Sequence, residues 1–205
     1  MTLKQKISNF WYYYKNYLFA GIIAIVVLVV CINSCKSRRN FDVNVLFMTH
    51  GGENGYYETD ELSALFDKYV QDVNGDGVAN TQFITIYYGT TVQQHNSANA
   101  TRSANLAAGK NVLFLVDEQN YNELKGGGFL ADISSLGNSP YLIGDRFEIY
   151  NSGMFETLTG SNMLSDQYYL CLRTLDKTKA ENDSSYVAQY EAAKTLLKNI
   201  IKAHG

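Results

Sequence analysis

The feature that most constrains this 205-residue chain is an uncharged apolar run from Tyr17 to Ile32. With its flanks, from Trp11 to Cys35, the stretch is long enough for a helix to cross a hydrocarbon core of about 30 Å. Lipid offers the backbone no hydrogen-bond partners, so the run is expected to be a helix, which satisfies its own N–H and C=O groups. We therefore expect a transmembrane helix over residues 17–35, preceded by a cytoplasmic N-terminal segment of residues 1–16.

The distribution of charge is consistent with a membrane anchor. The first 40 residues carry six basic and no acidic residues, whereas the whole chain has a net charge of −3. Lysines favour the cytoplasmic side, and the rings of residues 11–14 favour the membrane–water interface. After a short linker over residues 36–40, we expect residues 41–205 to form one extracytoplasmic domain of a single-pass bacterial membrane protein. Because this domain is acidic, nucleic acid is not expected as a partner.

Two alternatives to a retained span remain open. A signal peptide would be cleaved, but no small-residue cleavage site follows the apolar run and the segment before it is long. A lipoprotein signal would instead place a lipid on Cys35, because Ile32-Asn33-Ser34-Cys35 has a Ser before the Cys and an Ile three residues before it.

Strand and helix patterns alternate through the rest of the chain. Strand patterns occur at 41–48, 82–88, 111–116 and 167–175, with shorter ones at 147–150 and 154–158. Helix patterns begin at Thr59 or Asp60, at Thr90, at Asp117 or Glu118, and at Ser184. This succession predicts an α/β fold, a three-layer domain with a mostly parallel sheet and helices on both faces.

Three segments resemble one protein family. They are Asp-Val-Asn-Gly-Asp-Gly at 72–77 between a helix and a strand, the helix-to-strand element at 106–116, and the short segment at 128–134. Residues 41–136 resemble the first lobe of bacterial extracytoplasmic solute-binding proteins of ABC transporters. The resemblance implies a periplasmic-binding-protein-like single lobe. About 30 weakly patterned residues stand where a second lobe would be inserted, so enclosure of a solute between two lobes is not expected.

The loop over residues 72–80 is a possible calcium site. Asp72, Asn74 and Asp76 place oxygen ligands at alternate positions, and Gly77 permits the sharp turn that a calcium loop needs. The position that should supply a bidentate carboxylate is Phe83. The alternative is a helix-to-strand turn, for which Asn-Gly and Asp-Gly give the required backbone freedom. No other cofactor is expected.

The candidate ligand residues follow the predicted parallel strands, because ligands of open α/β sheets bind beyond the carboxyl ends of the strands. Tyrosines there could stack on sugars or on a partner's side chains, while polar groups supply hydrogen bonds. These positions could equally be solvated loop residues. The candidates are Thr49, His50, Tyr56, Tyr57, Tyr88, Thr90, Asp117 and Gln119.

The sequence has no nucleophile elbow, P-loop or His-Glu-x-x-His motif. Our first hypothesis is therefore a non-catalytic, membrane-anchored binding module that recognises a protein or a glycan. The second is a hydrolase of envelope polymers that uses His50, Glu53 and Asp117. The third is a structural subunit of a membrane complex.

Overall fold

The computed structural model describes residues 3–36, 41–51, 59–158 and 167–205. The chain divides into two compact units, Met1–Asn40 and Phe41–Gly205. Each unit is described by itself below.

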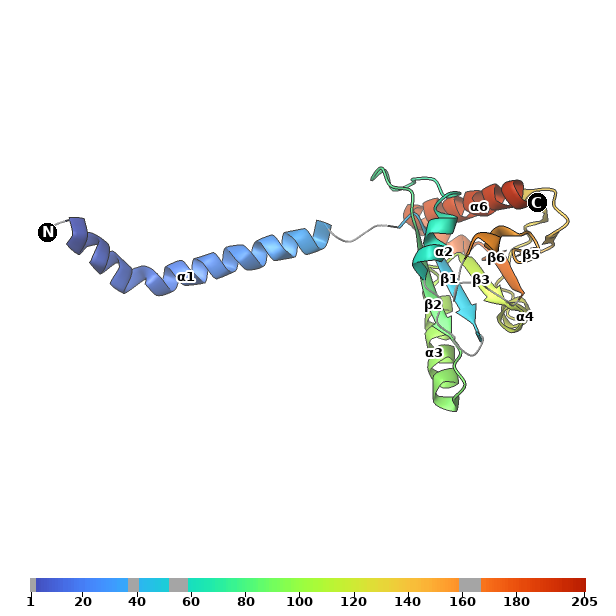
Figure 1. The fold of residues 1–205 in the computed structure, drawn as a ribbon, viewed down its shortest axis with the longest axis horizontal. Coiled ribbons are helices and arrows are strands. Elements are labelled where there is room, and N and C mark those ends of the chain that lie inside the picture. The colour runs from blue at the N-terminus through green and yellow to red at the C-terminus, as the bar shows by residue number, and fades with distance from the viewer. Residues whose placement is uncertain (1–2, 37–40, 52–58, 159–166) are drawn as a thin grey trace. The chain divides into compact units, whose positions relative to one another are not determined.

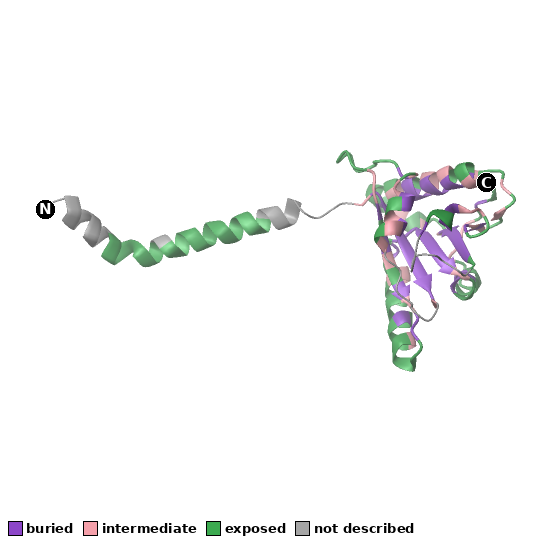
Figure 2. Cartoon of the chain, viewed as in Figure 1, coloured by how far each residue is buried: buried purple, intermediate pink, exposed green. Residues whose placement is uncertain are grey.

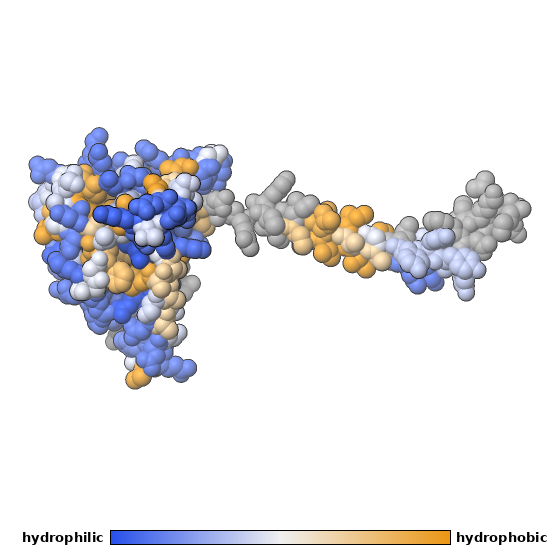
Figure 3. Space-filling view, turned by 180° about the vertical axis from the view of Figure 1, so that it is seen from behind, coloured by the Kyte–Doolittle hydropathy of each residue, from blue (hydrophilic) through white to orange (hydrophobic). Residues whose placement is uncertain are grey.

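The first unit is one long helix, α1 (Leu3–Lys36). Its segment Trp11–Cys31 has a mean hydropathy of 2.0 and is the one helix, in the described part of the chain, long and apolar enough to cross a membrane. Side chains described along this segment are exposed on every side (Figure 2), and apolar residues follow one another along it (Figure 3). A signal sequence near an N-terminus would share these properties. Residues 3–16, which we expected in a separate N-terminal segment, lie in the same helix.

The second unit combines six strands with five α-helices among the described residues (Figure 1). Its elements in chain order are β1 (Val43–Thr49), α2 (Thr59–Phe66), β2 (Thr81–Tyr87), α3 (Val92–Ala108), β3 (Leu113–Asp117), α4 (Glu118–Gly126), a 3₁₀ turn η1 (Ser134–Leu136), β4 (Leu142–Ile143), β5 (Arg146–Glu148), a second 3₁₀ turn η2 (Met154–Thr157), β6 (Tyr168–Leu172), α5 (Lys177–Asn182) and α6 (Ser184–His204). The α/β class is as expected from the alternating patterns.

The six strands form one mixed sheet in the order β2-β1-β3-β6-β5-β4. β1 pairs in parallel with β2 and β3, but β6 is antiparallel to β3 and to β5, and β4 is antiparallel to β5. The expectation of a mostly parallel sheet therefore applies to the first three strands and is corrected for the rest. Two residues connect β4 to β5, and so short a connection makes an antiparallel hairpin, since parallel neighbours need a crossover. Residues 154–157, expected as a strand, form η2.

Two apolar clusters lie on the two faces of the sheet. Alternate side chains of the strands point to opposite faces, so Phe47 and Leu115 pack with α2 and α6, whereas Met48 and Val116 pack with α3 and α4. Strands β1, β3 and β6 are buried almost throughout (Figure 2). This double covering explains the continuous apolar runs of β1 and β3.

Capping residues mark both ends of α3 and the start of α4. Thr91 caps α3 through a capping box with Gln94, and Gly109 ends that helix with φ 62°, a left-handed conformation that favours glycine. Asp117 caps α4 by accepting a hydrogen bond from the backbone N–H of Asn120. The residue that ends β3 therefore also begins α4.

Candidate functional site

The candidate site lies where the chain reverses its direction across the sheet. From β1 the chain crosses by α2 to β2 on one side of β1, and from β2 it crosses by α3 to β3 on the other side. The two helices lie on opposite faces, because α2 packs in one apolar cluster and α3 in the other. Such a topological switch point leaves a crevice beyond the carboxyl ends of the two strands that flank it. Here these strands are β1 and β3.

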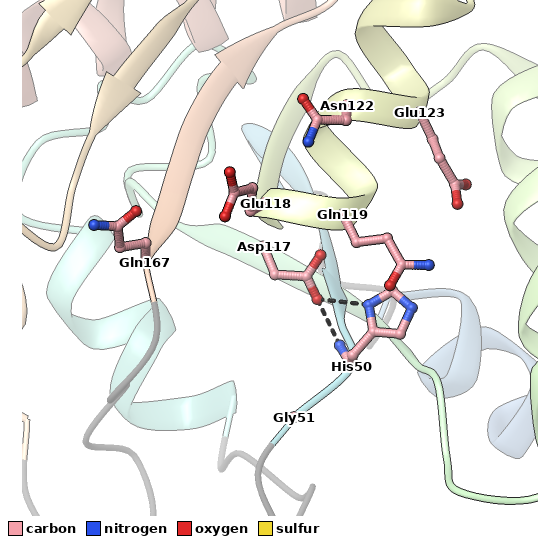
Figure 4. Close-up of a pocket in the computed structure, with 8 residues that line it drawn as sticks. All are labelled: His50, Gly51, Asp117, Glu118, Gln119, Asn122, Glu123 and Gln167. Atoms are coloured by element: carbon pink, nitrogen blue, oxygen red, sulfur yellow. Dashed lines mark hydrogen bonds and ion pairs between the residues drawn. The ribbon is translucent and has the colours of Figure 1, made fainter.

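His50 follows β1 and Asp117 ends β3, so the two side chains meet at this crevice. The Nδ1 atom of His50 lies 2.8 Å from Oδ2 of Asp117, and the backbone N–H of His50 donates to the same oxygen over 2.6 Å (Figure 4). An ionised carboxylate can only accept, so Nδ1 carries the proton in this pair. The Nε2 atom of neutral His50 then has a free lone pair, and it is turned away from Asp117 (Figure 4).

Asn120 holds the carboxylate from the other side. Its backbone N–H and its side-chain Nδ2 each donate to Oδ1 of Asp117 over 2.9 Å. Asn120 is fully buried, and its Oδ1 has no hydrogen-bond partner among the described residues. Turning the amide over would place Oδ1 against the carboxylate, so the hydrogen bonds fix its orientation. With four accepted hydrogen bonds, Asp117 is an orienting group for His50.

An aromatic cluster supports the imidazole of His50. Its ring stacks on that of Tyr88, with centroids 4.4 Å apart and planes at 18°. The ring of His95 in α3 lies 6.0 Å from His50 and 5.9 Å from Tyr88. Burial raises the pKa of Tyr88, an effect that the nearby Arg102 guanidinium opposes and the carboxylate of Asp117 reinforces. The phenol therefore stays protonated and neutral beneath His50.

A wide cavity of about 860 Å³, open to solvent, adjoins the pair. The side chains that line it carry polar groups and come from the ends of β1 and β3, the start of α4 and the residue before β6 (Figure 4). The lining residues are His50, Gly51, Asp117, Glu118, Gln119, Asn122, Glu123 and Gln167. Arg102 of α3 forms an ion pair with Glu123, which offsets one of the negative charges of the cavity.

The structure brings three of the predicted ligand residues to this cavity, namely His50, Asp117 and Gln119. Two others cannot contact a ligand directly, which corrects our expectation. Thr49 is fully buried, with its hydroxyl 2.6 Å from that of Tyr168, and Tyr88 is 4% exposed beneath the imidazole. Both belong to strands or strand ends covered on both faces.

The remaining predicted residues are not part of the described cavity. Thr90 is exposed in the turn before α3 and is not among the lining residues. Tyr56 and Tyr57 lie outside the described residues, as does Glu53.

Sequence reasoning missed several residues that the fold places here. Glu118, Asn122 and Glu123 belong to the first turns of α4, and a search of the helix that Asp117 begins would have found them. No comparable signal marks Gln167. It reaches the cavity because β6 runs antiparallel to β3, so the start of β6 meets the end of β3.

The possible calcium loop lies at the amino-terminal end of the parallel strands, before β2 and opposite the cavity. The carboxylate of Asp72 accepts the backbone N–H groups of Gly75 and Gly77, and Asp76 accepts that of Val78. Asp42, 1% exposed, accepts the N–H groups of Val73, Asn74 and Asn80 over 2.9–3.1 Å. These hydrogen bonds account for the closed shape of the loop, and calcium binding there stays a prediction.

In the described part of the chain, no group of three or more His, Cys, Asp or Glu side chains is arranged to hold a metal ion. Comparison with family models, with curated proteins and with solved structures gave no match for this chain. Functional inference therefore rests on the geometry of the cavity and on the chemistry of its lining.

Proposed function

We propose that this protein is a membrane-anchored, extracytoplasmic binding module whose ligand occupies the cavity beside His50 and Asp117. The observation that carries the proposal is the position of a wide polar cavity at the switch point between β1 and β3. Ligands of open α/β sheets bind at this place because the connections leave the sheet toward opposite faces there. The domain would act as a single lobe similar to the first lobe of solute-binding proteins of ABC transporters.

The lining favours a ligand rich in hydroxyl groups, such as a surface glycan. The amides of Gln119, Asn122 and Gln167 offer both donors and acceptors, and neutral His50 offers an acceptor at Nε2. Glu118 adds carboxylate acceptors. The cavity is wide and open, which suits a segment of a longer chain better than a small solute enclosed on all sides. The role is therefore recognition of a glycan.

The test is a glycan array probed with the full chain in detergent micelles. Wild-type protein should bind a restricted set of glycans. The double variant Gln119→Ala/Asn122→Ala, which removes two exposed amides, should bind them at least tenfold more weakly. Gln71→Ala is the matched control, because it removes an exposed amide far from the cavity, next to the loop at the amino-terminal end of the parallel strands. Equal affinity of the double variant and wild type would contradict the proposal.

The anchor is the second part of the proposal. Trp11–Cys31 of α1 would span the membrane, with the three lysines of the N-terminal residues on the cytoplasmic side. Protease added to intact cells should then degrade residues 41–205. Survival of this domain until lysis would show that the orientation is reversed. Mass analysis of the intact chain for a diacylglycerol on Cys35 would separate a retained span from a lipoprotein.

One observation favours a second candidate, a hydrolase of envelope polymers. Asp117 holds His50 in the tautomer whose Nε2 can accept a proton from an attacking water molecule, as in general-base catalysis. Turnover of the glycans selected by the array, lost in His50→Ala, would support this candidate. Binding without release of reducing ends would leave recognition as the function.

A further inference from the structure

The two imidazoles beside the cavity lead to an inference that goes beyond glycan recognition. We propose that His50 and His95 together bind one late first-row divalent ion, with Cu²⁺ and Zn²⁺ as the preferred metals. The ion would have two protein ligands, and its remaining positions would be open to water or to a ligand in the cavity.

The environment of His50 is that of a metal-binding histidine. Its Nδ1–H donates to Asp117, and a histidine that ligates through one nitrogen usually donates the other ring N–H to a carboxylate or carbonyl. The buried Asn120 in turn holds that carboxylate in place. Stacking on Tyr88 limits rotation of the ring, so Nε2 presents its lone pair in a fixed direction.

The distance between the two rings is close to what one shared ion requires. Zn–N bonds of about 2.0–2.1 Å in a tetrahedral arrangement place two imidazole centroids roughly 5 Å apart. The centroids of His50 and His95 are 6.0 Å apart and their planes are tilted by 41°. A side-chain rotation of His95 that brings its centroid closer by about 1 Å and turns one of its ring nitrogens toward Nε2 of His50 would complete the pair. His95 is half-buried in the first turns of α3, whose start the capping box of Thr91 fixes.

The donor set decides the class of metal. Imidazole nitrogens suit copper, zinc and nickel, whereas calcium and magnesium prefer oxygen ligands. Since no group of three or more His, Cys, Asp or Glu side chains among the described residues is arranged to hold a metal ion, the site would keep positions open, unlike a closed structural zinc site. This separates the histidine site from the possible calcium loop, which lies at the amino-terminal end of the parallel strands and offers only oxygens.

The inference does not depend on glycan recognition, because metal binding can be measured with no glycan present. The experiment is isothermal titration of the full chain, in detergent and without a polyhistidine tag, with Cu²⁺, Ni²⁺ and Zn²⁺. The chain has three histidines, so His204→Ala is a matched control that removes the one histidine paired with Tyr69. Circular dichroism would verify that each variant is folded.

We expect one ion per chain, tighter binding of Cu²⁺ than of Ni²⁺ or Zn²⁺, and no competition from excess Ca²⁺ or Mg²⁺. His50→Ala and His95→Ala should each weaken binding at least tenfold, and His204→Ala should change it less than twofold. His95→Ala is the decisive variant, because its ring is partly exposed and makes no hydrogen bond that holds Asp117. Wild-type affinity in His95→Ala, or an equal loss in His204→Ala, would overturn the proposal.

Discussion

The imidazole of His50 donates from Nδ1 to Oδ2 of Asp117 over 2.8 Å, and this bond joins residues that are 67 positions apart in the chain. The two residues stand at the ends of neighbouring parallel strands, at the point where the connections diverge to opposite faces of the sheet. The pair therefore closes the floor of the crevice while leaving one imidazole nitrogen free. This hydrogen bond therefore joins the two strand ends at the cavity and orients the imidazole of His50.

The buried amide of Asn120 should be the most sensitive support of that bond. Asn120→Ala removes a donor to the carboxylate of Asp117, and the free energy of unfolding should fall by about 1–3 kcal/mol. Asn120→Asp should be worse, because it places a second negative charge against the first. Urea denaturation of residues 41–205, a separate compact unit with its own core, would measure both changes.

The control for this series is Asn122→Ala, an exposed position two residues further along α4. Its free energy of unfolding should stay within about 0.5 kcal/mol of the wild-type value. A loss in Asn122→Ala as large as that in Asn120→Ala would show that the helix, and not the buried amide, is responsible.

At the amino-terminal end of the parallel strands, Asp42 should stabilise the loop before β2. Three backbone N–H groups donate to its buried carboxylate, and Asp42→Asn should lower the free energy of unfolding by about 2–4 kcal/mol, since hydrogen bonds to charged groups are the strong ones. The exposed Asp76, changed to Asn, should cost less than about 1 kcal/mol. Thermal and urea unfolding would rank the two variants, and the reverse order would contradict this reading of the loop.

Calcium binding by residues 72–80 can be tested in the same assay. If the loop binds the ion, millimolar CaCl₂ should raise the melting temperature of the wild type, because a ligand that binds only the folded state stabilises it. Asp72→Ala should remove the increase, and MgCl₂ should not reproduce it. An identical melting temperature with CaCl₂ and with EDTA would leave hydrogen bonding alone as the reason for the closed shape of the loop.

The histidine at the end of α6 should give stability a defined pH dependence. Nε2 of His204 lies 2.7 Å from the hydroxyl of Tyr69, and burial lowers the pKa of His204 from its ordinary value of about 6.5. The folded state therefore favours the neutral ring, and as the pH falls below about 6.5 the unfolded chain binds its proton first. The contribution of the neutral His204 to the free energy of unfolding is complete above that pH and is lost progressively below it. His204→Gln should lose less stability between pH 7 and pH 5 than the wild type does, and equal losses would exclude this histidine as the cause.

The pattern of the chain determines most of the first half of the fold. Continuous apolar runs, with helix patterns beginning at Thr90 and at Asp117 or Glu118, were enough to predict β1–β3 and the helices α3 and α4, although the N-cap of α3 is Thr91, one residue later. In the second half, the strand pattern at 167–175 and the helix pattern from Ser184 likewise predicted β6 and α6, but the segment before them could not be predicted in the same way. Residues 134–158 hold β4, β5 and η2, whose few residues carry no period long enough to distinguish a strand from a turn.

The sequence predicted the part of the site that depends on topology and missed the part that depends on packing. The rule that ligands lie beyond carboxyl strand ends selected His50 and Asp117 correctly as neighbours, because it depends on topology alone. It could not distinguish Tyr88, which the fold buries, from an exposed tyrosine. Nor could it reveal His95, whose place beside His50 depends on how α3 packs against the sheet.

We expect a ligand to occupy the cavity beyond the carboxyl ends of β1 and β3. The most direct measurement is a heteronuclear NMR titration of residues 41–205 with a glycan selected by the array, following the side-chain amides. We expect the side-chain amide resonances of Gln119, Asn122 and Gln167 to shift together with a single affinity, while that of Gln71 stays in place. Shifts confined to Gln71 and the loop before β2, with the three cavity amides unchanged, would contradict it.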